Sequence, residues 1–169
     1  MAVAMKDVGT RVAALAAGAA LLGSGAAAAS PPPATNSWSD FHCTASSQAP
    51  GGGDETGALV PGKPAALALC RYGPLPSYAL EGSRVVTRRK RVHRLVRRFN
   101  ALPSPPAGPI SCPADDGSSI VAYALYRRAA TRIVHVGLSG CLIVSRGDVV
   151  RWDTPSGGKL VHTLEDLTR

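Results

Sequence analysis

The fold of this chain is decided by residues 112–141, which read CPADDGSSIVAYALYRRAATRIVHVGLSGC. Two apolar runs, 120–126 and 133–138, lie between the terminal cysteines and flank a predicted turn at 128–130. Alternate side chains of a strand point to opposite faces, and both sets are apolar in the first run. We therefore predict a β-hairpin whose first strand is central in a sheet and covered on both sides. A disulfide between the two cysteines would close a loop of about 30 residues and stabilise the fold by about 3.5 kcal/mol in the chain-entropy model.

The N-terminal residues have the pattern of an export signal. Two basic residues precede an apolar run at 12–22, and small residues at 27–29 offer a cleavage site. We predict a signal peptide over residues 1–29, and the alternative is an uncleaved membrane anchor. No second apolar run is long enough to span a bilayer. We therefore expect a secreted, extracellular protein with no stable membrane insertion after cleavage.

Export changes the expected state of the cysteines, of which the chain has four: Cys43, Cys70, Cys112 and Cys141. In an oxidising compartment this even number predicts two disulfides, for which three pairings are open. We favour the sequential pairing, first with second and third with fourth. Zinc is the alternative, but the C-x₂₋₄-C spacing of zinc sites does not occur. We predict no metal and no cofactor.

Composition divides the rest of the chain into a tail and a domain. Residues 30–64 are rich in Pro, Gly and Ser and predict a tail, with Trp38 and Phe41 packing it onto the domain. Residues 65–169 predict an α+β domain. Besides the hairpin, its expected elements are strands at 65–72, 78–87, 141–145 and 149–152, a basic helix before Pro103, and a last helix containing Leu160, Leu164 and Leu167. We expect an antiparallel sheet of about five strands, two helices on one face and two disulfides.

The basic helix has the clearest periodicity in the chain. Its apolar face is predicted to contain Val92, Leu95, Val96, Phe99 and Leu102. We expect Thr87 to be its N-cap and Pro103 to stop it. The other face carries seven cations: Arg88, Arg89, Lys90, Arg91, Arg94, Arg97 and Arg98. Cleavage would remove two basic residues and one acidic residue and lower the net charge from +8 to +7, so these seven cations account for all of it.

Two interpretations of these cations stay open. The first is a solvated arginine-rich face on a helix whose apolar face packs on the sheet. The second is an anion-binding surface for an envelope polyanion or an acidic protein partner. No aromatic residues alternate with the cations and no DNA- or RNA-binding motif surrounds them, so we predict no nucleic-acid partner. The sequence does not indicate an oligomeric state.

Motifs for catalysis are scarce, and we predict no catalytic residues. Ser139 lies in Gly-Leu-Ser-Gly, which lacks the glycine spacing of a nucleophile elbow. The pair Asp115-Asp116 is followed by Gly117 and indicates a turn. Arg146-Gly147-Asp148 matches an adhesion tripeptide, but Gly-Asp between apolar runs is ordinary hairpin chemistry. A secreted hydrolase assembled from distant residues is the least favoured alternative.

The residues around the cysteines carry two resemblances. The motifs at 69–73, 112–115 and 137–141 and the basic helix resemble a group of secreted bacterial proteins of unassigned function over residues 66–169. Cys-Pro followed by a hairpin and a cysteine about 30 residues on is similar to the bacterial subtilisin-inhibitor family, which consists of small secreted proteins with two disulfides. That resemblance implies an inhibitory loop at Pro113, Ala114 and Asp115, with P1 at Ala114 and P1′ at Asp115. The chain differs from the family in its Asp-Asp-Gly after Cys-Pro-Ala, its wider first cysteine pair and its last helix.

Taken together, these patterns predict a secreted, disulfide-stabilised binding module that is not an enzyme. Two specific forms are open: a protease inhibitor acting through residues 113–115, and an envelope-binding protein acting through the basic helix.

Overall fold

A computed structural model of the 169-residue chain describes residues 38–44 and 57–169. The predicted signal peptide, residues 1–29, lies outside the described residues, as do 30–37 and 45–56 of the Pro/Gly/Ser-rich segment. No helix in the described ranges is long and apolar enough to cross a membrane.

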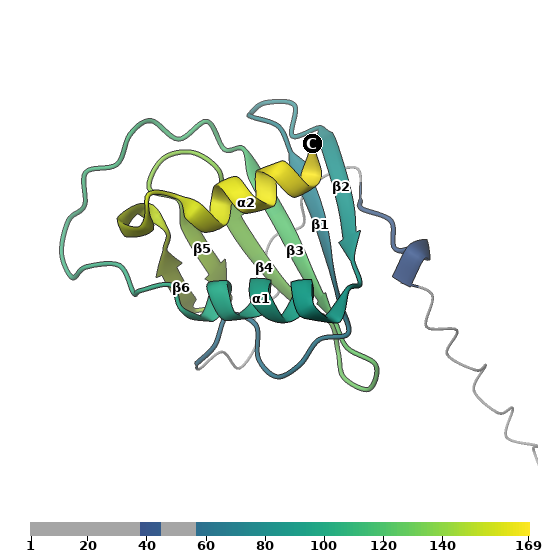
Figure 1. The fold of residues 1–169 in the computed structure, drawn as a ribbon. Coiled ribbons are helices and arrows are strands. Elements are labelled where there is room, and N and C mark those ends of the chain that lie inside the picture. Colours follow the sequence, from purple (N-terminus) through teal and green to yellow (C-terminus); the bar gives the residue numbers. More distant parts are fainter. Residues whose placement is uncertain (1–37, 45–56) are drawn as a thin grey trace, which may run out of the picture. The chain divides into compact units, whose positions relative to one another are not determined.

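The domain contains one antiparallel sheet of six strands in the order β2-β1-β3-β4-β5-β6 (Figure 1). The strands are β1 (Ala66–Tyr72), β2 (Leu80–Val86), β3 (Ser119–Leu125), β4 (Arg132–Gly137), β5 (Ile143–Arg146) and β6 (Val149–Trp152). The predicted α+β class is confirmed, but the sheet has six strands where we expected about five. Each of the six segments expected to be extended forms one strand, and at the C-terminal edge Gly147, with φ of 53°, allows the tight turn through which the four-residue strands β5 and β6 pair.

Both helices, α1 (Arg89–Asn100) and α2 (Lys159–Thr168), cross the same face of the sheet (Figure 1). Leu67 and Leu69 of β1 point to this face and share one buried cluster with Phe99 of α1 and Leu164 of α2. Alternate residues of β1 and β3 therefore meet the helices, as the strand periodicity predicted. Leu59 and Val60, which fall in the Pro/Gly/Ser-rich segment, are also fully buried in this cluster.

The opposite face of the sheet holds a second buried cluster, which includes Ala68, Cys70 and Tyr123. Trp38 and Phe41 pack against it, and the rings of Phe41 and Tyr123 lie 4.9 Å apart between centroids. Because β3 lies between β1 and β4 and its buried side chains join both clusters, the predicted central strand covered on both sides is confirmed.

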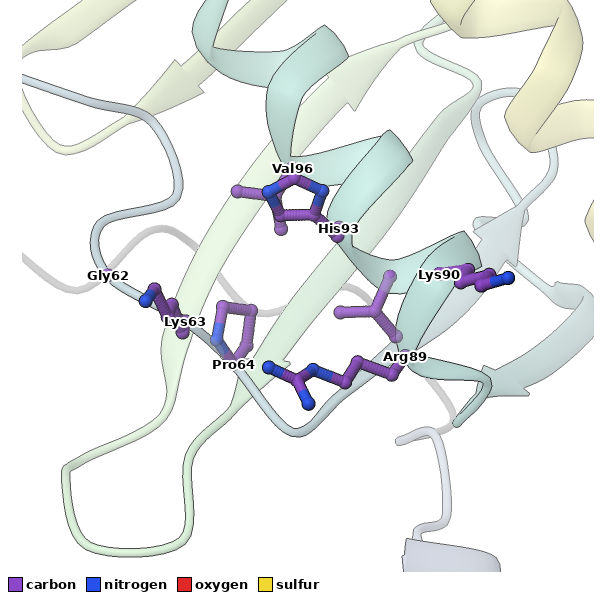
Figure 2. A pocket seen from close by; sticks show the side chains of 8 residues that line it. Gly62, Lys63, Pro64, Arg89, Lys90, His93 and Val96 are labelled. Carbon is purple, nitrogen blue, oxygen red and sulfur yellow. The ribbon is translucent and has the colours of Figure 1, made fainter.

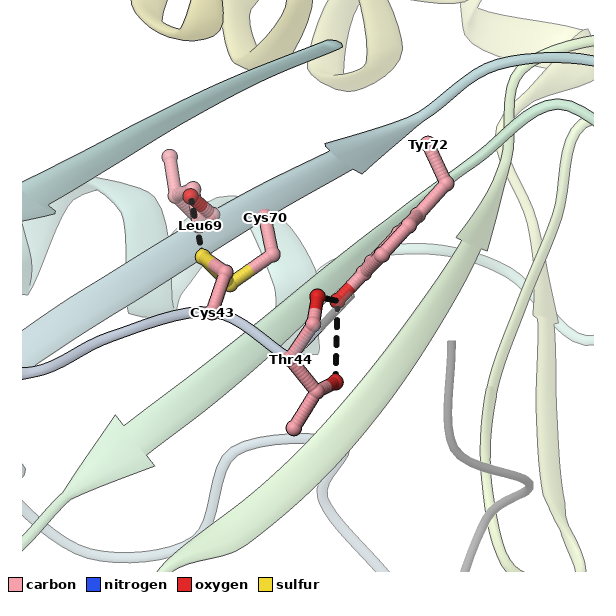
Figure 3. The surroundings of a disulfide bond; sticks show 5 residues. All are labelled: Cys43, Thr44, Leu69, Cys70 and Tyr72. Atoms are coloured by element: carbon pink, nitrogen blue, oxygen red, sulfur yellow. Dashed lines mark hydrogen bonds between the residues drawn. A yellow bond between two sulfur atoms is a disulfide. The ribbon is translucent and has the colours of Figure 1, made fainter. Parts of the chain in front are cut away.

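The two disulfides join the cysteines in sequential order, as predicted. Cys43 bonds to Cys70 with a Cα–Cα distance of 5.7 Å, and Cys112 bonds to Cys141 with a distance of 5.1 Å. Figure 3 shows the first bridge, where Tyr72 from the end of β1 donates its hydroxyl to the carbonyl of Thr44 at 3.1 Å. The short segment 38–44 is therefore attached to β1 by a covalent bond and a hydrogen bond, and to β3 by the packing of Phe41 on Tyr123.

The N-cap predicted for α1 is wrong by one residue. Arg88 is the N-cap, and its side chain makes no capping hydrogen bond. Helix α2 is capped from outside its own first turn, because the carboxylate of the fully buried Asp153 accepts hydrogen bonds from the amides of Leu160 and Val161, each at 2.9 Å. The 3-10 turn η2 (Thr154–Ser156) lies between this cap and the helix.

Candidate anion-binding site

Helix α1 separates its apolar and charged residues completely. Its buried residues are Val92, Leu95, Val96 and Phe99, and all seven cations at 88–98 are exposed. At about 100° per residue, Arg94 and Arg97 lie opposite the buried stripe, while Arg89 and His93 lie on one flank. The other flank meets α2, where Arg98 donates a hydrogen bond to the Thr163 hydroxyl at 2.7 Å. The predicted amphipathic helix is confirmed.

The seven cations have no carboxylate partner in the part of the chain that the structure describes. Ion pairs in these ranges use other basic residues, such as Arg71 with Glu81. The first turn of α1 contains no acidic residue, although the partial positive charge of a helix N-terminus favours one. The cations of this helix are therefore available to interact with solvent or with a ligand.

A groove runs along one flank of α1, between the helix and the loop that precedes β1. Its first cavity has a volume of about 420 Å³ and is lined by Gly62, Lys63, Pro64, Arg89, Lys90, Val92, His93 and Val96. A second cavity of about 700 Å³ adjoins it and is lined by Lys63, Pro64, Ala65, Thr87, Arg89, Tyr126, Arg127, Arg128 and Ala129. We call these two cavities the basic groove, because together their lining residues include five cations and no acidic residue.

Sheet pairing explains why the cations of the basic groove come together from three distant segments. β1 pairs antiparallel with both β2 and β3, with Leu67 opposite Val86 and Ala66 opposite Leu125. The start of β1, the start of α1 and the turn after β3 therefore lie at the same end of the sheet. This arrangement places Lys63, Arg89 and the turn arginines around one depression.

The loop wall of the groove is held by hydrogen bonds along its length. The side-chain amide of Asn100 pairs with the backbone of Val60, accepting from its amide at 2.9 Å and donating to its carbonyl at 2.8 Å. Tyr126 donates its hydroxyl to the carbonyl of Pro61, and the amide of Ala65 donates to Leu125 at 2.8 Å. Because both ends of the loop are tied to α1 and β3, the cavity is formed before any ligand arrives.

Figure 2 shows how the side chains of the first cavity lie. Arg89 extends from α1 toward Pro64, while Lys90 points away from the loop. The apolar residues of its lining are Pro64, Val92 and Val96, of which the two valines are almost fully buried, whereas its cations Lys63 and Arg89 are exposed. The cavity is thus apolar inside and cationic at its rim.

The second candidate surface is the loop that the inhibitor resemblance indicated. Pro113, Ala114 and Asp115 are all exposed and follow directly after the disulfide of Cys112. Ser139 fixes the end of this loop, because its hydroxyl contacts the carboxylates of Asp115 at 2.6 Å and Asp116 at 2.7 Å. The loop is therefore exposed and braced on both sides of Ala114.

The pair Asp115-Asp116 has the hydrogen bonding of a turn. Hydrogen bonds from Ser118 and Ser139 lower the pKa of Asp116 to about 2, and the amide of Gly117 donates to Asp115 at 2.9 Å. The Ser139 hydroxyl contacts both carboxylates, so it holds the two aspartates within one turn. Within the described ranges, no group of three His, Cys, Asp or Glu residues is arranged to hold a metal ion.

In the remaining motif, Arg146-Gly147-Asp148, the arginine side chain is buried. Arg146 is 5% exposed and donates to the carbonyl of Ala58 at 2.8 Å. An adhesion receptor would need that guanidinium at the surface, so the tripeptide has a structural role in the β5–β6 turn.

Sequence reasoning identified the helix cations but missed the groove. Lys63, Arg127 and Arg128 were not singled out, because each lies in a connecting segment without periodicity. One available signal was a pair of arginines directly after a strand of strong β-propensity.

Comparisons with models of known protein families, with curated proteins and with solved structures found no match to this chain.

Proposed function

We propose that this protein is a non-catalytic binding module that works outside the cell membrane and attaches to an anionic surface of the cell envelope through α1. The observation that carries the proposal is the set of seven exposed cations, which have no carboxylate partner in the described ranges. Such a patch attracts a polyanion by releasing its counterions or by contact with anionic lipid headgroups.

The position of the cations supports a role beyond solubility. Four of them, at 88–91, fall at or before the first helical turn, where positive charge opposes the helix dipole at a cost of a few tenths of a kcal/mol each. Neighbouring cations at i, i+3 and i+4 also repel one another. A helix selected only for stability would place acidic residues here, so the charge is best explained by a negatively charged partner.

Vesicle binding tests this proposal. The test variant replaces three cations that line neither cavity and whose side chains form no hydrogen bond in the described ranges: Arg91→Gln, Arg94→Gln and Arg97→Gln. At about 1 kcal/mol per charge near an anionic membrane, partitioning onto vesicles containing phosphatidylglycerol should fall about 100-fold at low salt. Binding of the wild type should also decline steeply toward 0.15 M salt, where the screening length is about 8 Å.

A matched control distinguishes the contribution of the α1 cations to vesicle binding from the contribution of net charge. The control variant loses the same number of exposed cations elsewhere: Arg84→Gln, Lys159→Gln and Arg169→Gln. It should retain most of the vesicle binding. Equal losses in the two variants, or wild-type protein that fails to bind at low salt, would refute the proposal and leave α1 as a solvated face of the scaffold.

A second candidate function, protease inhibition, is favoured by the loop at 113–115. An inhibitory loop must be exposed and rigid, and this one lies between the Cys112–Cys141 disulfide and the Ser139 hydrogen bonds. The protein should then block subtilisin stoichiometrically, and Ala114→Gly should weaken inhibition by loosening the backbone. Ala129→Gly, in the exposed turn after β3, is the matched control and should inhibit normally. Cleavage of the loop without inhibition would exclude this function.

A further inference from the structure

We propose that the basic groove binds one molecule of a single-chain anionic amphiphile, such as an alkyl phosphate. The alkyl chain lies on an apolar base formed by Pro64 and the exposed edges of Val92 and Val96, and the anionic head lies at the rim with the exposed Lys63 and Arg89. The inference specifies a ligand for the helix of the proposed function and rests on it.

The shape of the groove favours a small ligand over a flat surface. A volume of about 420 Å³ lies within the range of sites for small molecules, roughly 300 to 1,000 Å³. A planar membrane or a stiff polymer can contact the exposed cations opposite the sheet, but it cannot fill a depression between a helix and a loop. Val92 and Val96 are 3% and 7% exposed, so the apolar surface open to a ligand comes mainly from Pro64 and from the aliphatic parts of the Lys63 and Arg89 side chains.

The chemistry of the groove favours an anionic head attached to an apolar chain. An inorganic anion would leave the apolar base in contact with water, and an uncharged amphiphile would leave the rim cations unpaired. Arg127 and Arg128 line the adjoining cavity, which shares Lys63, Pro64 and Arg89 with the first. The head therefore lies where cations from the loop, the helix and the β3–β4 turn converge.

The walls of the site are held in place without a ligand. Asn100 fixes Val60 at one end of the loop, and the Tyr126 hydroxyl fixes Pro61 near the middle. The ligand therefore does not have to order the loop, and its binding energy is not reduced by that entropy.

Titration calorimetry with three probes tests the inference: dodecyl phosphate below its micelle concentration, inorganic phosphate, and an uncharged dodecyl glycoside. Dodecyl phosphate should bind with one-to-one stoichiometry and at least about tenfold more tightly than either other probe, because only it satisfies both the base and the rim. Equal affinity for inorganic phosphate would show that the apolar base takes no part. Equal affinity for the glycoside would show that the rim cations take no part. Either result overturns the inference.

Matched variants of equal charge locate the site. Lys63→Gln with Arg89→Gln should weaken dodecyl phosphate binding at least about tenfold, because two charge-assisted hydrogen bonds are lost. Arg94→Gln with Arg97→Gln, on the outer face, should change it less than about twofold, and similar losses in both pairs would refute the site. His93 is exposed and lines the cavity, so His93→Trp should block binding by filling it without disturbing the core.

The outcomes of the vesicle and amphiphile experiments are distinguishable. Vesicle binding without dodecyl phosphate binding would refute the groove as an amphiphile site and leave the proposed function standing. If the protein bound neither vesicles nor dodecyl phosphate, both the proposed function and the amphiphile site would be refuted. Unchanged thermal unfolding of each variant is the check that the domain remains folded.

Discussion

Removal of the buried carboxylate of Asp153 should be among the most damaging single changes in this domain. Asp153 is 0% exposed and joins the end of β6 to the start of α2. One carboxylate oxygen accepts the amides of Leu160 and Val161 at 2.9 Å each, and the other accepts the hydroxyl of Ser156. The side chain therefore satisfies two of the backbone donors that a helix N-terminus leaves unpaired.

The magnitude follows from these contacts. Asp153→Ala removes the carboxylate that caps α2, and the loss of a capping side chain costs about 1–2 kcal/mol. It also leaves a second buried amide without an acceptor, which adds roughly 1–2 kcal/mol. The free energy of unfolding should therefore fall by about 2–4 kcal/mol. Asp153→Asn keeps an oxygen acceptor but loses the negative charge at the positive end of the helix, so it should cost about half as much.

Urea unfolding of the oxidised protein measures this loss. Asp166→Ala is the control on the same helix, because Asp166 is exposed and its ion pair with Arg169 spans 3.9 Å. Such a surface pair contributes about 0.5 kcal/mol or less. If Asp153→Ala destabilised the domain no more than Asp166→Ala, the capping account of α2 would be refuted.

Three further predictions concern the scaffold. Intact oxidised protein should have a mass about 4 Da below the fully reduced value, with no thiol open to alkylation, and any alkylated cysteine in folded protein would contradict the two bridges. Burial lowers the pKa of His135 from its usual 6.5, so the folded state favours the neutral imidazole. The free energy of unfolding should therefore have its full value above about pH 6.5 and should fall as the pH drops from there through the lowered pKa of the folded state. His135→Leu should flatten that pH dependence in unfolding measurements, and an unchanged slope would assign it elsewhere. Asn100→Ala should destabilise the domain by about 1–2 kcal/mol and speed hydrogen exchange at the Val60 amide, whereas unchanged protection there would mean that the loop is held by other contacts.

Local periodicity explains why so much of the fold could be predicted. The strands around residues 120–126 and 133–138 and the helix around 88–102 each repeat apolar residues at the spacing of their own secondary structure. The cations of α1 were found for the same reason, since a helix that buries one face must expose the other. Two disulfides were also predicted, because the number of cysteines is even and the predicted export signal implies an oxidising compartment, and the favoured sequential pairing is the one found.

The predictions from sequence were wrong where the conformation of one segment depends on its contacts with another segment. Thr87 was expected to cap α1, but the helix begins after Arg88 without a side-chain cap. The cap of α2 was missed because Asp153 lies seven residues before Leu160, beyond the spacing of capping motifs, and η2 brings it back to the helix. Boundaries of this kind are decided by the fold around them and not by the local pattern.

The sequence by itself determined the helices, the strands, the even number of cysteines and the excess of positive charge, because each depends on residues that are neighbours in the chain or on composition. Only the tertiary structure decided that this charge borders a groove. Lys63, Arg89 and Arg127 have no spacing that relates them, and they meet because β1 pairs with β2 on one side and with β3 on the other. Antiparallel pairing brings the start of one strand beside the ends of its neighbours, and that contact between distant segments formed the site.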